Sequence, residues 1–347
     1  MVEITSLETT SGLDILMKGR RPLVQKNAEG KLEMVCNAEG YPAVIKRGEL
    51  MVHSLLRKQE WEELDAAVIA MVKLRLNGIQ DLRENNLVQP LGGLGTMVSQ
   101  WNVASEKPSA TVSMDGRTAG NRDRVDKKLY GVPVPIIHDE YQIGARELEA
   151  SRRLGDTLDV TEAQESAAAV AEELEDILFN GETSVVVGGS GIFGMTTLAS
   201  RLTATAAAFG GGDFGTISNI LPTFTGILSG LAALRYYGPF GFYLSNTQYF
   251  QMLAFYTDGS GQTALARVLQ LPQIKYVKPS DHLADGALTG MQLTKNVIDL
   301  ATALDVTNRE WTSGDEMSLN YKVMMAAVPR FKTDYSGHAG VAHATAC

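Results

Sequence analysis

Cysteine and histidine are scarce in this chain of 347 residues, and their scarcity excludes several kinds of site. The only cysteines are Cys36 and Cys347, and two cysteines alone build neither a disulfide framework nor a four-ligand zinc site. We interpret them as ordinary thiols, with a disulfide between subunits through Cys347 as the minor alternative. The five histidines show no H-x-x-x-H spacing, and none joins a cysteine or carboxylate at metal-ligand spacing. The sequence therefore predicts no metal site.

Familiar catalytic and targeting motifs are also missing. There is no G-K-[ST] phosphate loop and no G-x-S-x-G nucleophile elbow, so we predict no catalytic residue. The N-terminus has no basic segment followed by an apolar run, unlike a secretory signal. The longest uncharged apolar stretch, 214–234, contains Asn219 and Pro222, which argue against a membrane span. The net charge of −9 argues against a surface that binds nucleic-acid phosphates.

What the chain does contain is typical of an ordered protein. Hydrophobic residues make up 44% and charged residues 20%, which allows one large core or two smaller ones. One motif favours a cofactor: Gly189 to Gly194 spells G-x-G-x-x-G, follows Val185–Val187, and has Asp213 about 20 residues further on. Because the next segment is Thr-rich and interrupted by glycines, with no apolar strand ending at Asp213, we favour a glycine loop. An NAD-binding oxidoreductase built on Gly189–Gly194 stays as an alternative of another class.

The strongest helix signal runs from Asp159 to Gly181. Asp159 and Glu162 have capping-box spacing, and Asn180-Gly181 is a stop signal. The acidic residues 172, 173, 175 and 176 fall largely off the apolar stripe, and we interpret them as a solvated or interface face. The stripe itself consists of Ala163, Ala167, Val170, Leu174, Ile177 and Leu178.

Residues 88–137 predict a long hairpin. Strand character near Trp101 is followed by strict alternation from Ala110 to Met114 and by a turn at Asp115-Gly116. The returning strand, 132–137, contains two prolines that cannot donate hydrogen bonds, which places it at a sheet edge. A two-stranded ribbon is marginal by itself, so we expect it to need a partner subunit. The charged tip, 117–128, is either solvated or a set of ion pairs between subunits.

Other elements surround this hairpin. A helix is predicted over 48–76, ending at Asn77-Gly78. An α/β lobe is predicted over 182–290, with a helix near Pro222–Leu234, a helix capped by Asn246, and a strand over 274–277. Alternation over 317–323 predicts a further strand in a pattern that ends at Pro329, and residues 1–45 read as an irregular extended arm.

The order of these elements carries a resemblance. A Pro-containing strand from Gly131, a short charged turn, a small-residue helix ending Glu-Asp-x-x-Phe-Asn-Gly and a Gly-rich loop resemble the HK97 fold, which tailed-bacteriophage shell proteins and encapsulins share. The resemblance implies an α+β fold. It further implies an N-terminal arm (1–47), a helix under the P-domain (48–87), an E-loop hairpin (88–137), a P-domain with spine helix (138–184), an A-domain (185–290), and P-domain strands with the C-terminal tail (291–347).

The same resemblance implies a function. We expect no enzyme but a major capsid protein of a tailed double-stranded DNA phage, which self-assembles through hexamers and pentamers into an icosahedral shell. The shell would be assembled in the host cytoplasm, form the virion, and enclose DNA without sequence-specific binding. Portal, scaffolding and decoration proteins are the implied partners, and no cleaved scaffolding segment, cofactor or membrane is expected. The alternative is an encapsulin shell that encloses an enzyme.

Overall fold

A computed structural model describes residues 2–3, 24–26, 32–34, 58–107, 110, 112–115, 117, 124–144, 146, 148, 160–256, 261–312 and 318–347. The chain divides into two units. The first comprises Met1–Trp61, Ile143–Leu158 and Thr312–Leu319. It contains a small antiparallel sheet in the order β1-β3-β2, where the sequence predicted irregular chain. These strands are β1 (Val2–Glu3), β2 (Val24–Lys26) and β3 (Leu32–Met34).

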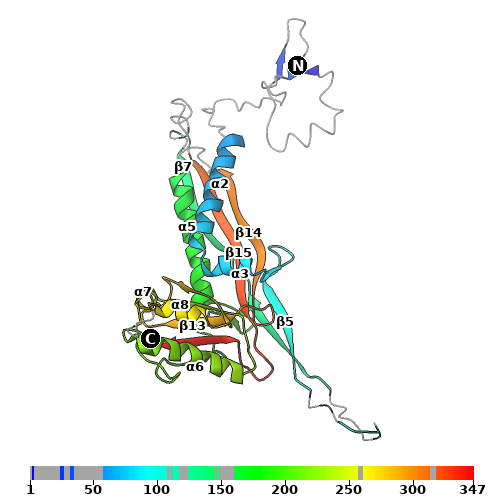
Figure 1. Cartoon of the computed structure of the whole chain (residues 1–347). Helices are drawn as coiled ribbons and strands as arrows, with labels where there is room; N and C mark the ends of the chain where they lie inside the picture. The colour runs from blue at the N-terminus through cyan, green and yellow to red at the C-terminus, as the bar shows by residue number, and fades with distance from the viewer. Residues whose placement is uncertain are drawn as a thin grey trace. The chain divides into compact units, whose positions relative to one another are not determined.

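The second unit is organised around a long helix, α5 (Thr161–Phe179), and a four-stranded sheet in the order β4-β14-β15-β7. Figure 1 shows α5 running alongside the two longest strands, and side chains of α5, β7, β14 and β15 line one common groove. The described residues therefore form a mixed α+β fold. The strands are β4 (Val88–Pro90), β7 (Ile137–Gly144), β14 (Ile298–Thr312) and β15 (Ser318–Phe331).

Helix α5 confirms the predicted apolar stripe, because all six of its residues are buried. The predicted start is wrong: the N-cap is Val160, which offers no side-chain cap bond, and Asp159 lies outside the described residues. The predicted end is correct. Asn180 is the C-cap, and Gly181 has φ +77, a left-handed conformation that glycine adopts without a Cβ clash.

The helix predicted over 48–76 ends where expected, its first ten positions, 48–57, lie outside the described residues, and a second helix that was not predicted follows it. Helix α2 (Lys58–Arg75) ends just before Asn77, and the short helix α3 (Gly78–Glu84) begins directly afterwards. Gly78 lies so close to α5 that an added Cβ would stand 2.7 Å from Leu178 Cδ2. Glycine at this position therefore lets α3 approach the long helix.

The predicted hairpin is shorter than expected. Strands β5 (Val98–Ala104) and β6 (Lys127–Pro133) pair antiparallel, from Val98↔Pro133 to Ala104↔Lys127. The predicted strand over 110–114 is wrong for its described residues, none of which is in a strand. Val112 and Met114 are fully exposed, so the alternation there has no face to bury. Gly116 of the predicted turn and positions 118–123 of the predicted tip, including Arg122 and Asp123, lie outside the described residues, and Lys127 and Lys128 belong to β6 and not to the tip.

The rest of the second unit forms what we call the lobe: a five-stranded sheet in the order β10-β16-β13-β11-β12 with helices packed on it. Its core is mainly aliphatic and includes four buried aromatic side chains, Phe214, Phe224, Phe240 and Phe242. The strands are β10 (Leu202–Thr205), β11 (Phe240–Leu244), β12 (Ile274–Pro279), β13 (Leu288–Gln292) and β16 (Val341–Thr345). The helices are η1 (Ile217–Asn219), α6 (Ile220–Ala233), α7 (Asn246–Gln251) and α8 (Ala264–Leu269).

Two further boundaries differ from the prediction. Ser245, not Asn246, is the N-cap of α7, and the Asn246 amide instead donates a hydrogen bond to Asp281. Strand β15 continues through Pro329 to Phe331. A strand tolerates a proline where its position needs no ladder hydrogen bond, and β15, with 14 residues, is longer than its neighbour β7, with 8. Among the described helices, none is long and apolar enough to span a membrane.

Candidate functional site

The G-x-G-x-x-G motif lies in a β-hairpin. Strands β8 (Gly181–Val187) and β9 (Ser190–Phe193) pair antiparallel, and Gly188 and Gly189 form the two-residue turn between them with φ values of +59 and +81. A dinucleotide site requires a strand, a glycine turn and then a helix. The cofactor interpretation of this motif is therefore wrong, and Asp213 instead accepts a hydrogen bond from Gly215 N at 2.9 Å within its own loop.

The described histidine and cysteine side chains do not form a reactive centre. In the described part of the chain, no group of three or more His, Cys, Asp or Glu side chains could hold a metal ion. The ring of His282 stacks on Phe179, with Nδ1 3.3 Å from an Asp176 oxygen. Cys347 is buried in the lobe, and burial, helped by Asp213, raises the pKa of its thiol to about 12. Cys36 lies outside the described residues.

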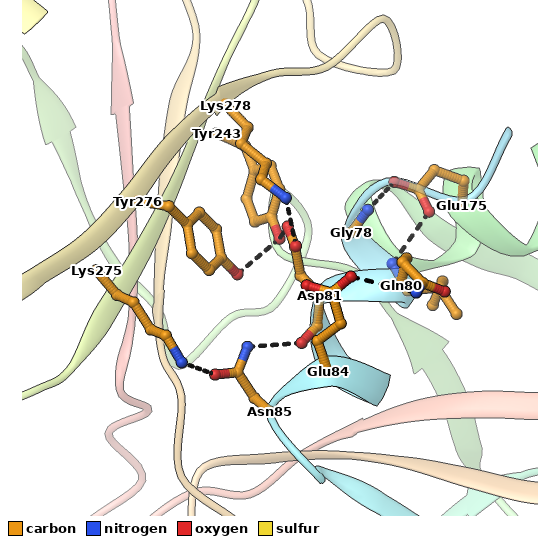
Figure 2. A network of polar contacts seen from close by, with 11 residues as sticks. Gly78, Gln80, Asp81, Glu84, Asn85, Glu175, Tyr243, Lys275, Tyr276 and Lys278 are labelled. Carbon is orange, nitrogen blue, oxygen red and sulfur yellow. Dashed lines mark hydrogen bonds and ion pairs between the residues drawn. The ribbon is translucent and has the colours of Figure 1, made fainter. Parts of the chain in front are cut away.

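A buried polar junction joins the long helix to the lobe, and α3 lies at its centre (Figure 2). On one side of α3, Glu175 of α5 accepts hydrogen bonds from the backbone N–H groups of Gly78 at 2.5 Å and Ile79 at 3.2 Å. Glu175 is only 2% exposed, so the prediction that it belongs to a solvated face is wrong. Burial raises the pKa of its carboxyl, while the two backbone hydrogen bonds oppose that shift.

On the other side of α3, Asp81 faces the lobe sheet. Its carboxylate, 2% exposed, accepts a hydrogen bond from Tyr243 Oη at 2.8 Å and pairs with Lys278 Nζ at 2.5 Å. The hydroxyl groups of Tyr243 and Tyr276 are 2.9 Å apart. Burial is the main reason that the pKa of Tyr243 lies well above its ordinary value, and Tyr276 and Asp81 add to the shift. Every one of these groups has a partner within the fold, which makes the junction structural.

Sequence reasoning missed this junction because nothing local marks it. Asp81 and Lys278 are separated by almost 200 positions in the chain. Glu175 does carry a signal in retrospect, because it lies four residues after Ala171 and three before Leu178, both of which are buried.

An open groove of about 650 Å³ lies beside α5 and β7. Acidic side chains and Trp311 line it, and Lys322 pairs there with Glu140 at 2.6 Å and lies over the Trp311 ring. The complete lining is Asp139, Glu140, Tyr141, Gln142, Glu162, Glu165, Ser166, Ala169, Trp311 and Asn320.

Several groups of large apolar side chains are exposed, and two of these groups bear on function. The β5–β6 hairpin exposes Leu129 (62%) in β6, and Met97 (73%) is exposed directly before β5. The lobe exposes a second group on and between α7 and α8, which we call the lobe-end patch. Exposed apolar groups of this kind mark surfaces that another molecule covers. The lobe-end patch consists of Phe250 (66%), Phe255 (65%), Leu269 (44%) and Leu253 (40%).

The fold places the chain in a known class: it has the HK97 fold of the capsid and encapsulin superfamily. The virus-like particle from Pyrococcus furiosus matches with a TM-score of 0.58 and 16% identity, over 82% of this chain and 98% of that one. The capsid of Myoviridae phage XM1 matches with a TM-score of 0.60 and 13% identity, over 78% and 92%. The empty GTA particle capsid matches with a TM-score of 0.52 and 13% identity, over 78% and 90%.

The sequence comparisons narrow the placement. The chain belongs to the family described as "Family of unknown function (DUF6260)", whose model matches residues 51–344. It is 24% identical over 277 residues to the type 1 encapsulin shell protein EncA of Myxococcus xanthus (strain DK1622). The aligned region covers 80% of this chain and 90% of that relative. The resemblance seen in the sequence is thereby confirmed. The relatives that the chain matches are shell proteins, which agrees with the expectation that it is a structural protein and not an enzyme.

Proposed function

We propose that this protein is the subunit of a closed, self-assembling shell of the encapsulin type, which encloses a protein cargo. The observation that carries the proposal is the β5–β6 hairpin, a two-stranded ribbon that exposes Leu129 and, directly before β5, Met97. Such a ribbon buries too little to be stable by itself, so a second copy is its natural cover. Similarity to EncA along 90% of that relative favours a compartment over a virion.

The division of the chain follows from this function. Residues 88–137 would be the E-loop that crosses a neighbour, 138–184 the P-domain with its spine helix, and 185–290 the A-domain. Residues 1–47 would form the N-terminal arm, 48–87 a helix under the P-domain, and 291–347 the returning strands and tail. Copies of one chain arranged as pentamers, with hexamers in larger shells, would then close the lattice.

The lobe-end patch supports the same proposal. Four large apolar side chains on and between α7 and α8 are 40 to 66% exposed. Residues 246–256 of that surface carry no charge, and a charge-poor, aromatic-rich surface is typical of the centre of a protein interface. We propose that these patches meet around the symmetry axes of each capsomer.

A phage capsid is the second candidate, favoured by the fold shared with the capsid of phage XM1. In that case the shell would form a virion, enclose double-stranded DNA without sequence-specific contacts, and work with portal, scaffolding and decoration proteins. The net charge of −9 suits a container that does not bind DNA tightly.

Purification and negative-stain microscopy test the proposal, with hollow particles as the expected result and uniform monomers or dimers as the refuting one. Phe250→Glu combined with Phe255→Glu should reduce particle yield by on the order of tenfold or more. The control is Ser229→Glu, at an exposed position of α6 that is not part of the patch. Particles isolated from the native host would contain a protein cargo if the shell is of the encapsulin type, and nuclease-protected DNA if it is a capsid.

A further inference from the structure

The side chain of Arg330, near the end of β15, lies at the base of the hairpin and is almost fully buried, with 6% of the residue exposed. Its Nε and Nη2 atoms donate to the two oxygens of Asp299, both at 2.6 Å. Its Nη1 atom donates to the Oγ of Ser99 in β5 at 2.7 Å. One planar guanidinium therefore connects a long strand of the sheet to a strand of the hairpin.

The same guanidinium contacts a second residue on that face of β5. Ser99 and Trp101 are two positions apart and point to one side of the strand, and the Trp101 ring lies 5.8 Å from the guanidinium of Arg330. Trp101 in turn stacks on Tyr130 of β6, with ring centroids 6.3 Å apart. Arg330 thus contacts β5 twice and reaches β6 through the stacked pair.

The segment that follows Arg330 contacts β6, the other strand of the hairpin. Lys128 of β6 lies over the ring of Tyr335 at 4.0 Å and donates to the Tyr335 carbonyl at 3.3 Å. Both strands of the hairpin therefore contact the six-residue segment that follows Pro329. Strand β6 also lies against the β8–β9 hairpin, and Glu106 pairs with Arg235 at 2.8 Å, but that ion pair is exposed to water. The Arg330 contacts are buried, so they are the strongest candidates for setting the direction of the hairpin.

We propose that Arg330 is a positioning residue for assembly: it fixes the direction of the β5–β6 hairpin before the hairpin meets a second copy. The proposal rests on the proposed function, because a fixed direction matters only if the hairpin docks on a neighbour. A hairpin already held in its docking direction loses less conformational entropy on association than one that swings freely. The forked geometry is essential, because an ammonium group cannot bind both oxygens of Asp299 and reach Ser99 in one plane.

The chain offers a matched control in Lys332. Its Nζ lies 2.6 Å from the same Asp299 oxygen that Arg330 Nη2 contacts. Loss of Arg330 therefore leaves Asp299 with a cationic partner, and Arg330→Met removes the link to the hairpin without stranding a buried charge. Lys332→Met removes a cation from the same carboxylate but leaves the link to Ser99 intact.

The first measurement is acrylamide quenching of Trp101 in dissociated subunits, with the other two tryptophans replaced by phenylalanine. Arg330→Met and Arg330→Lys should each raise the quenching constant about twofold or more, because the Trp101 face loses its cover. Lys332→Met should leave it unchanged. Where Arg330→Met fails to fold by circular dichroism, Ser99→Ala replaces it, because that change deletes only the hydrogen bond to the hairpin.

The second measurement is particle yield by size-exclusion chromatography and microscopy. Both Arg330 variants should assemble on the order of tenfold less than the parent, and Lys332→Met as well as the parent. Unchanged quenching in the Arg330 variants, equal damage from Lys332→Met, or raised quenching with undiminished yield would each overturn the proposal. If the parent forms no particles, the shell function fails, and the proposal that rests on it fails too. The quenching series would then still show whether Arg330 orients the hairpin.

Discussion

Replacing Lys278 with methionine should destabilise the protein more than replacing Asp81 with asparagine, although the two side chains form one ion pair. The reason is their unequal exposure: the Asp81 side chain is 2% exposed and that of Lys278 41%. Lys278→Met leaves a buried carboxylate that keeps its hydrogen bond from the Tyr243 hydroxyl but loses its paired ammonium group. Asp81→Asn leaves an ammonium group that water already reaches.

The expected magnitudes follow from that asymmetry. A buried charge that loses its partner costs about 3–5 kcal/mol, which is our expectation for Lys278→Met. Loss of charged hydrogen bonds with a solvated remnant costs about 1.5–3 kcal/mol, which is our expectation for Asp81→Asn. The control is Arg83→Met on the same helix. Its partner Asp305 is 70% exposed, and such a surface pair contributes under about 1 kcal/mol.

Equilibrium urea unfolding of the dissociated subunit measures all three variants, and the midpoints are comparable if the m-values agree. The double variant should cost less than the sum of the single changes, because both remove the same interaction. An Asp81→Asn cost equal to or above that of Lys278→Met would refute the reasoning, since it would mean that water reaches the Asp81 carboxylate.

Three further outcomes are expected. Gly191→Ala should lower the free energy of unfolding by under about 1 kcal/mol and Gly194→Ala by about 3 kcal/mol or more. The reason is that an added Cβ would lie 3.8 Å from the Phe193 ring at position 191 but 2.4 Å from Gly181 N at position 194. Equal urea midpoints for the two variants would contradict the β8–β9 hairpin, and the parent protein should show no NAD binding in a titration. Burial and the nearby Arg201 lower the pKa of His343. The unfolded chain therefore binds a proton more readily than the folded state, and the free energy of unfolding should fall as the pH drops below about 6.5. A His343→Gln variant with the same pH dependence as the parent would disprove this. In a Cys36→Ser background, Cys347 should react with Ellman's reagent at about pH 8 roughly a thousandfold more slowly than an unfolded control, because a pKa of about 12 leaves little thiolate; equal rates would show that the thiol is accessible.

Contacts between distant parts of the chain explain where the prediction from sequence failed. The alternation from Ala110 to Met114 matched a strand, but no neighbouring strand covers either face of the described residues there, and Val112 and Met114 stay exposed. Periodicity reports which face a strand would bury, and cannot report whether a partner exists. The glycine motif failed for a related reason, since Gly188 and Gly189 suit a tight turn between antiparallel strands as well as a turn before a helix.

The sequence alone determined the long helix α5, the two-stranded character of the hairpin and the order of elements that marks the HK97 fold. Each of these features depends on residues close together in the sequence: a repeating apolar stripe, the Asn180-Gly181 stop signal, and prolines at a sheet edge. Only the tertiary structure decided that Glu175 and Asp81 are buried on opposite sides of α3, and that Arg330 connects the hairpin to the sheet. The partners of these charged groups come from distant parts of the chain, so no local pattern distinguishes them from charges in water.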